Sequence, residues 1–184
     1  MKLGFIGTGK IASAVITGIC TSKISFQKII ISPRNRNIAQ KLKKRFRKVS
    51  IAKTNQEIVD KCNWVFLAVT PKVGAKILPK LNFRSNQKII SFIATINLTQ
   101  LKKIVKKKAK IVRAIPLPFI SLRKGPVPIC PPDKQVKSFF NKIGTGPFPN
   151  EIGGNGIALT IFAFFLTIFF NWAKLIVEMK LIIF

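Results

Sequence analysis

Histidine and tyrosine are both absent from this 184-residue chain, and acidic residues are scarce. Without histidine, a Ser-His-Asp triad and histidine-based general acid catalysis are both excluded. The five acidic residues and the three cysteines, Cys20, Cys62 and Cys130, do not show metal-ligand spacing. We therefore expect no metal site, and the sequence identifies no catalytic residue. Unpaired cysteines and an amino terminus unlike a secretory signal predict a cytoplasmic protein.

Positive charge dominates the chain, with 33 lysines and arginines and a formal net charge of +28. Such a balance is typical of proteins that bind nucleic acid or an anionic membrane surface. Here the basic residues are spread along the chain, whereas a nucleic-acid site gathers them on one face among aromatic residues. We do not expect a nucleic-acid partner. RNA binding stays an alternative because of the basic runs at residues 41–48 and 102–108.

Strand-like and helix-like segments alternate through the first 130 residues. Strands are expected at residues 2–6, 28–32, 49–52, 63–69, 88–92 and 110–114, and helices at 11–20, 35–46, 73–81, 98–105 and 134–142, with one more helix capped by Thr54 or Asn55. This alternation predicts an α/β fold, a Rossmann-like, doubly wound and mostly parallel sheet with helices on both faces. We assign it to residues 1–145.

Residues 146–184 are expected to form a separate linker and hydrophobic C-terminal helix. Residues 152–173 carry no charge, and the continuous apolar part is residues 157–172. That part is shorter than the roughly 20 residues of a membrane span. We expect a helix buried in a helical core or in a homo-oligomer interface. A membrane-associated helix and a frameshifted sequence beyond residue 145 are the alternatives.

Small residues follow the first expected strand in a G-x-G-x-x-A frame, at Gly7, Gly9 and Ala12. The first glycine permits a tight turn, the second lets the backbone approach a pyrophosphate, and the alanine keeps the helix close to the sheet. The helix amino terminus adds free N–H groups and a positive dipole end. The strand, turn and helix in this order predict a dinucleotide-binding site; an α/β domain that binds no dinucleotide is the alternative.

The end of the second expected strand indicates which dinucleotide is bound. An NAD site places an acidic residue there to bind the ribose hydroxyls. This chain has no acidic residue before Glu57 and has Ser32, Arg34 and Arg36 instead. A serine hydroxyl and forked guanidinium donors suit a 2′-phosphate, so we predict NADP as the cofactor. The alternative is that these arginines are ordinary surface charges.

Four blocks along residues 1–130 resemble one family of enzymes. The first is GFIGTGKIASAVITG, which resembles G-F-I-G-x-G-x-M-A-x-A with Ile11 in place of Met. The second is TNQEIVDKCNWVFLAVTP, similar to a segment that ends A-V-K-P, and the third is KIISFIATINLTQLKK, similar to a strand and turn S-x-x-A-G. The fourth, KIVRAIPLPFISLRKG, occupies the place of R-x-M-P-N-T-P. The family that these blocks resemble is the pyrroline-5-carboxylate reductases.

The resemblance implies a fold and a reaction. The family has an amino-terminal Rossmann domain and a helical dimerisation domain, and it transfers hydride from NAD(P)H to the C=N bond of a cyclic imine carboxylate to give proline. Such a reaction would make a small-molecule imine the substrate and NADPH the cofactor. The resemblance implies cofactor contacts at Gly7, Thr8, Gly9, Lys10, Ile11, Ser32, Asn55, Ala68, Val69, Thr70, Pro71 and Ala94, to which the charge argument adds Arg34.

The chain departs from the family pattern at several positions. Thr70 stands in place of a lysine, Thr95 in place of a glycine, and the P-N-T-P asparagine has no counterpart in Pro116-Leu117-Pro118. The G-S-G-P-A signature of the helical domain is not visible, so we expect that domain to be truncated or divergent. The function predicted is an NADP-dependent imine reductase. The alternative is a non-catalytic or truncated dinucleotide-binding protein, tethered to a membrane if its apolar helix inserts.

Overall fold

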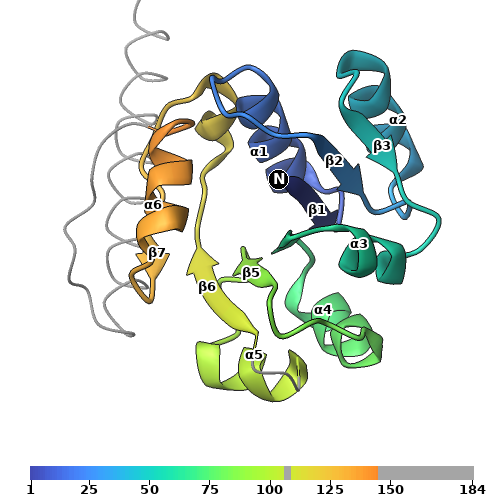
Figure 1. Ribbon diagram of the computed structural model, residues 1–184, viewed down its shortest axis with the longest axis vertical. Helices are drawn as coiled ribbons and strands as arrows, with labels where there is room; N and C mark the ends of the chain where they lie inside the picture. The colour runs from blue at the N-terminus through green and yellow to red at the C-terminus, as the bar shows by residue number, and fades with distance from the viewer. Residues whose placement is uncertain (106–108, 145–184) are drawn as a thin grey trace, which may run out of the picture. The chain divides into compact units, whose positions relative to one another are not determined.

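A seven-stranded sheet runs through the computed structural model, which describes residues 1–105 and 109–144 (Figure 1). In chain order the elements are β1 (Lys2–Ile6), α1 (Lys10–Cys20), β2 (Lys28–Ile31), α2 (Arg36–Arg45), β3 (Val49–Ile51), α3 (Asn55–Lys61), β4 (Trp64–Leu67), α4 (Pro71–Ile77), the 3₁₀-helix η1 (Leu78–Lys80), β5 (Lys88–Ser91), α5 (Leu98–Val105), β6 (Lys110–Ala114), the 3₁₀-helix η2 (Pro118–Leu122), β7 (Ile129–Cys130) and α6 (Lys134–Asn141). The expected segment 146–184, with its apolar part at 157–172, lies outside the described residues.

The strand order is β3-β2-β1-β4-β5-β6-β7, and the first six of these strands are parallel. An order of 3-2-1-4-5-6 is that of the doubly wound dinucleotide-binding fold. The predicted α/β, Rossmann-like and mostly parallel sheet is therefore confirmed. The carboxyl ends of the six parallel strands consequently share one edge of the sheet.

Two local features differ from the sequence expectation. The short strand β7 pairs antiparallel with β6 through Arg113–Cys130 and Ala114–Ile129, inside a proline-rich stretch where no strand was predicted. The helix expected at residues 73–81 is divided into α4 and η1, because Pro79 cannot donate the hydrogen bond that would continue the α-helix. None of the helices among the described residues is long and apolar enough to span a bilayer.

Buried apolar side chains form one cluster on each face of the sheet. The first cluster joins the strands to α1, α2 and α6, and the second joins them to α3, η1 and α5. Strand β4 contributes to both, since Phe66 belongs to the first cluster and its neighbours Val65 and Leu67 to the second. This alternation confirms that the β4 segment is buried on both faces, as expected of a central parallel strand.

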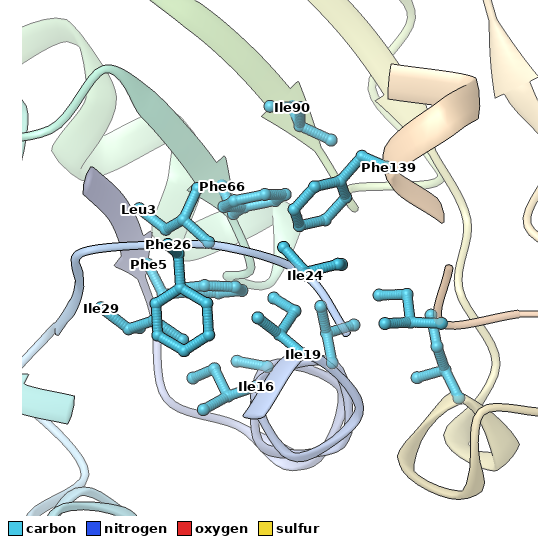
Figure 2. Packing of buried hydrophobic residues seen from close by; sticks show 14 of the residues in the cluster. Leu3, Phe5, Ile16, Ile19, Ile24, Phe26, Ile29, Phe66, Ile90 and Phe139 are labelled. Carbon is cyan, nitrogen blue, oxygen red and sulfur yellow. The ribbon is translucent and has the colours of Figure 1, made fainter. Parts of the chain in front are cut away.

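Aromatic rings join α6 to the centre of the sheet in the first cluster (Figure 2). The rings of Phe5 in β1 and Phe66 in β4 stack with centroids 4.5 Å apart. Phe139 of α6 lies 5.9 Å from Phe66 and 5.2 Å from Trp64. Offset and tilted ring pairs at these separations are favourable beyond the area that they bury. The last described helix is therefore part of the same core as the first strand.

A buried ion pair holds α6 to the amino-terminal ends of β5 and β6. The Asp133 carboxylate accepts hydrogen bonds from the amides of Gln135 and Val136, which caps α6. It also lies 2.9 Å from the Lys88 ammonium and 3.2 Å from that of Lys110. Burial raises the pKa of the Asp133 carboxyl, but the Val136 amide and the two ammonium groups lower it by more, so that the pKa falls to about 2.

We expect Asp133→Asn to lower the free energy of unfolding at pH 7 by about 3 kcal/mol, because Lys88 would stay buried without its carboxylate. The asparagine can still cap the helix, so the loss reports the ion pair. Because the folded pKa is lowered, the carboxylate stabilises the protein above the unfolded pKa, and that stabilisation disappears as the pH falls toward about 2.

Thermal and urea unfolding between pH 7 and pH 2 measure both effects. Asp60→Asn is the matched control, since Asp60 is an exposed carboxylate that accepts a hydrogen bond from Gln56. The control should change the unfolding free energy by no more than about 0.5 kcal/mol. Equal losses in the two variants would contradict the assignment.

Candidate functional site

The sequence-predicted site residues all lie at the carboxyl edge of the sheet. The run from Gly7 joins β1 to α1, Ser32 and Arg34 follow β2, and Asn55 begins α3. Residues 68–71 join β4 to α4, and Ala94 follows β5. Strands β2 and β4 lie on opposite sides of β1, so the chain reverses its direction of winding here. An open α/β sheet binds its ligand at such a switch point.

Gly7 makes the turn from β1 fit closely against the turn from β4. Its φ is +102°, in the region that favours glycine, and a Cβ placed there would collide with the Ala68 carbonyl and lie 2.8 Å from Val69 Cγ1. The Ala68 amide in turn donates to the Ile6 carbonyl at 2.8 Å. Two predicted blocks, the glycine turn and the segment after β4, are therefore in direct contact.

Gly9 caps α1 and leaves the helix terminus open. A Cβ at this position would meet no atom of the described chain within 4 Å, and no side chain caps the helix. The Gly9 carbonyl accepts from Ser13 at 3.0 Å, which makes Lys10, Ile11 and Ala12 the residues of the first turn. Amides in a first turn have no acceptor within their own helix, and they suit an anion. The first turn also contains no acidic residue.

Ser32 links three loops at this edge. Thr8 Oγ1 donates to the Ser32 carbonyl at 3.3 Å, which joins the turn after β1 to the turn after β2. Ser32 Oγ donates to Asn55 Oδ1 at 2.8 Å, which adds the start of α3. Ser32 is only 2% exposed, so its hydroxyl is held in place. The sequence predicted Thr8, Ser32 and Asn55 as site residues without showing that they are hydrogen-bonded to one another.

The loop after β2 presents only positive charge. Arg34 is exposed, and Asn35 caps α2 by accepting from the Ile38 amide at 3.3 Å. The first acidic residue of the chain, Glu57, lies in α3. Its carboxylate accepts from Lys61 Nζ and from the Lys53 amide, both at 2.7 Å, and these bonds lower its pKa. No acid is therefore present in the loop that would bind the ribose hydroxyls of NAD.

At the β5 end of the site, a buried arginine supports an exposed backbone turn. Ala94 and Thr95 are exposed after β5, as are Thr70 and Pro71 before and at the start of α4. The Ala94 carbonyl accepts a hydrogen bond of 2.6 Å from Arg113 Nη2 in β6. Sequence reasoning did not single out Arg113 as a site residue. The available signal was an arginine in the interior of β6, next to the apolar residues Val112 and Ala114.

Cys20 and Cys62 offer no reactive thiolate near this edge. Burial raises the pKa of Cys62 to about 12 and that of Cys20 to about 11, so both stay protonated at neutral pH. Across residues 1–105 and 109–144, no three histidine, cysteine or acidic side chains gather where they could hold a metal ion. What the edge offers is backbone amides, a hydroxyl, an amide side chain and guanidinium groups.

Comparison with known proteins agrees with this geometry. Residues 2–95 match the model of a family described as NADP oxidoreductase coenzyme F420-dependent. Among curated relatives, pyrroline-5-carboxylate reductase 3 of Danio rerio is 30% identical over 119 residues, which are 63% of this chain and 41% of that protein. The chain therefore matches less than half the length of this relative.

Solved structures show the same fold. The crystal structure of 1-pyrroline-5-carboxylate reductase from Streptococcus pyogenes matches with a TM-score of 0.66 and 26% identity, over 81% of this chain and 58% of that one. The Plasmodium falciparum pyrroline carboxylate reductase with NADP bound matches with a TM-score of 0.66 and 23% identity, over 78% and 55% of the two chains. At 23% identity the likeness to the second structure shows the fold alone.

The two glycines of the turn should respond differently to a methyl group. We expect Gly7→Ala to lower the free energy of unfolding by about 2 kcal/mol or more, because of its positive φ and the collision with Ala68. Gly9→Ala should leave the unfolding free energy within about 0.5 kcal/mol, since its φ of −82° suits alanine. Chemical unfolding of the two variants measures this. A Gly9→Ala loss as large as that of Gly7→Ala would show that the space at Gly9 is filled.

Proposed function

The chain belongs to the family described as NADP oxidoreductase coenzyme F420-dependent, and we propose that it is an NADPH-dependent reductase of a small cyclic imine carboxylate. The observation that carries the proposal is the open amino terminus of α1, where a Cβ added at Gly9 would meet no atom of the described chain within 4 Å, beside the tight turn at Gly7. The resemblance of residues 1–130 to pyrroline-5-carboxylate reductases supplies the substrate class. Bound NADPH would supply the hydride that reduces the C=N bond.

In this proposal the backbone holds the pyrophosphate and side chains select the 2′-phosphate. The first-turn amides, including those of Lys10 and Ile11, would donate to the pyrophosphate, with the α1 dipole favouring its charge. Ser32 and Arg34 would donate to the 2′-phosphate. Ala94 and residues 68–71 would lie beside the nicotinamide, because they follow β5 and β4 at the same edge.

The bond between Ser32 and Asn55 is compatible with this role. In the structure the Ser32 hydroxyl donates its single proton to Asn55 Oδ1. A phosphate accepts hydrogen bonds only, so the serine proton must turn toward it when the phosphate binds. If the Asn55 amide rotates by half a turn, its Nδ2 can donate to Ser32 Oγ. The Ser32 O–H is then free to donate its hydrogen bond to the phosphate. Asn55 would thus hold Ser32 with or without the ligand.

The reaction does not require an acidic side chain from this edge. An imine that is already protonated accepts hydride directly and becomes a neutral amine, so the protein has to bind and orient rather than donate a proton. The groups found at the edge can do this. The assignment of residues 146–184 to oligomerisation belongs to the same proposal, and sedimentation of the full chain tests it.

A second candidate is dinucleotide binding without reduction. Two departures from the reductase pattern favour it, since Thr70 and Thr95 stand in place of a lysine and a glycine, and both are exposed at the proposed nicotinamide end. Fluorescence titration of the full chain with NADPH, followed by turnover of 1-pyrroline-5-carboxylate to proline, separates the candidates. Binding with turnover supports the reductase, and binding alone supports the second candidate. No binding at millimolar NADPH overturns both.

Gly9→Ala should weaken NADPH binding about tenfold or more without unfolding the protein, because a methyl group would occupy the approach to the first turn of α1. Titration of cofactor fluorescence measures the dissociation constant. Ser138→Ala, on the exposed surface of α6, is the control and should bind NADPH as the native chain does. Unchanged affinity in Gly9→Ala would mean that the pyrophosphate does not lie at this turn.

Arg34→Ala should weaken NADPH binding about tenfold and leave NADH binding unchanged, because the guanidinium would contact only the 2′-phosphate. The ratio of the two dissociation constants is the measurement. Arg47→Ala removes the same charge from an exposed position just beyond α2 and controls for the general field of a basic protein. If both variants lose affinity for NADPH equally, Arg34 is an ordinary surface charge.

A further inference from the structure

Arg113 is a buried cation close to the proposed nicotinamide end of the site. It is 9% exposed and lies in β6, opposite Ser91 of β5 in the sheet register. Its neighbours Val112 and Ala114 belong to the first apolar cluster, whereas Ile111 belongs to the second. Side chains alternate along a strand, so Arg113 is on the Ile111 face, the face covered by α3, η1 and α5.

The charge of Arg113 is not balanced by a carboxylate in the part of the chain that the structure describes. The ion pairs found there join Glu57 to Lys61 and Asp133 to Lys88 and Lys110. Arg113 Nη2 donates to the Ala94 carbonyl at 2.6 Å, and its buried Nε has no hydrogen-bond partner. A guanidinium does not lose its proton in a protein, so the buried charge persists. Burial of such a charge without a counter-ion is costly.

The hydrogen bond to Ala94 places this charge directly behind an exposed turn. Ala94 is exposed after β5, at the edge shared by the parallel strands. In the proposed function, on which this inference rests, the nicotinamide lies against Ala94. The guanidinium would then be separated from the ring by the Ala94 peptide, on the side away from solvent. Charges interact more strongly there than across water.

We propose that Arg113 is a positioning residue whose buried charge makes the site bind NADPH more tightly than NADP⁺. When NADPH gives up a hydride, its nicotinamide ring gains one positive charge and the rest of the cofactor keeps its charge. A nearby fixed cation therefore raises the free energy of the bound oxidised form and leaves that of the reduced form nearly unchanged. The same hydrogen bond fixes the Ala94 turn. This arrangement favours release of NADP⁺ once the hydride has been transferred, and it makes hydride donation itself less favourable within the complex.

The dissociation constants of NADPH and NADP⁺ for the full chain test the inference, with intrinsic fluorescence or calorimetry as the readout. We expect the native chain to bind NADPH about tenfold or more tightly than NADP⁺. Arg113→Met removes the charge and should bring the ratio close to one. Arg113→Lys keeps the positive charge but loses the planar set of guanidinium donors. It should therefore keep most of the ratio of the two dissociation constants and weaken the binding of both NADPH and NADP⁺.

Arg84→Met is the matched control. Arg84 Nη2 also donates to a backbone carbonyl, that of Cys62 at 2.9 Å, but this bond is at the opposite, amino-terminal edge of the sheet. The variant loses the same charge and the same kind of bond as Arg113→Met, and its ratio should equal that of the native chain. An equal change in both variants would assign the effect to net charge and overturn the inference.

The native chain alone gives a decisive result if Arg113→Met does not fold. Equal affinity for NADPH and NADP⁺ in the native chain would overturn the role of Arg113 and leave the proposed function intact. No binding of either form would overturn the proposed function and, with it, this inference. A native preference that persists in folded Arg113→Met would show that the charge of Arg113 is not its source.

Discussion

The close contact between the turn after β1 and the turn after β4 is the constraint on which the rest of the site depends. These two strands are parallel neighbours in register, from Leu3–Trp64 to Ile6–Leu67, so their carboxyl ends meet side by side. Only a residue without a Cβ fits against the Ala68 carbonyl at the φ of Gly7. The turn starts α1 beside β4, and the strand order reverses at the same place. The open helix terminus, Ser32 and residues 68–71 are therefore brought to one edge.

The scarcity of acidic residues gives this edge its electrostatic character. Each of the three acidic residues in the described part of the chain has a local structural partner: Glu57 binds Lys61 and the Lys53 amide, Asp60 accepts from Gln56, and Asp133 caps α6 and pairs with Lys88 and Lys110. What remains at the carboxyl edge is positive, from the α1 terminus, Arg34 and Arg113. Such an edge suits an anionic dinucleotide and lacks the acid that would select NAD. At this edge the positive charge of the chain therefore suits an anionic dinucleotide, which is a different ligand from a nucleic acid.

The two apolar clusters, one on each face of the sheet, hold the strands that lead to this edge in place. Strand β4 supplies side chains to both clusters, and the aromatic contacts of Phe66 join β1 and α6 through the first. The ion pair of Asp133 fixes the other end of α6 to β5 and β6. Residues at the carboxyl edge therefore rest on elements that are packed on both sides. A rigid scaffold of this kind lets short loops present ligand-binding groups in defined positions.

The sequence by itself determined the class of the fold, the order of most elements and the family. Alternating apolar strands and amphipathic helices allow few topologies, and the glycine spacing is tied to one turn. Strand β7 and the division between α4 and η1 were missed because prolines obscure the local pattern. Only the tertiary structure decided that Thr8, Ser32 and Asn55 are hydrogen-bonded together, and that Arg113 supports Ala94 from the neighbouring strand. These contacts join residues 19 to 24 positions apart, and such pairings depend on strand order and register rather than on local spacing.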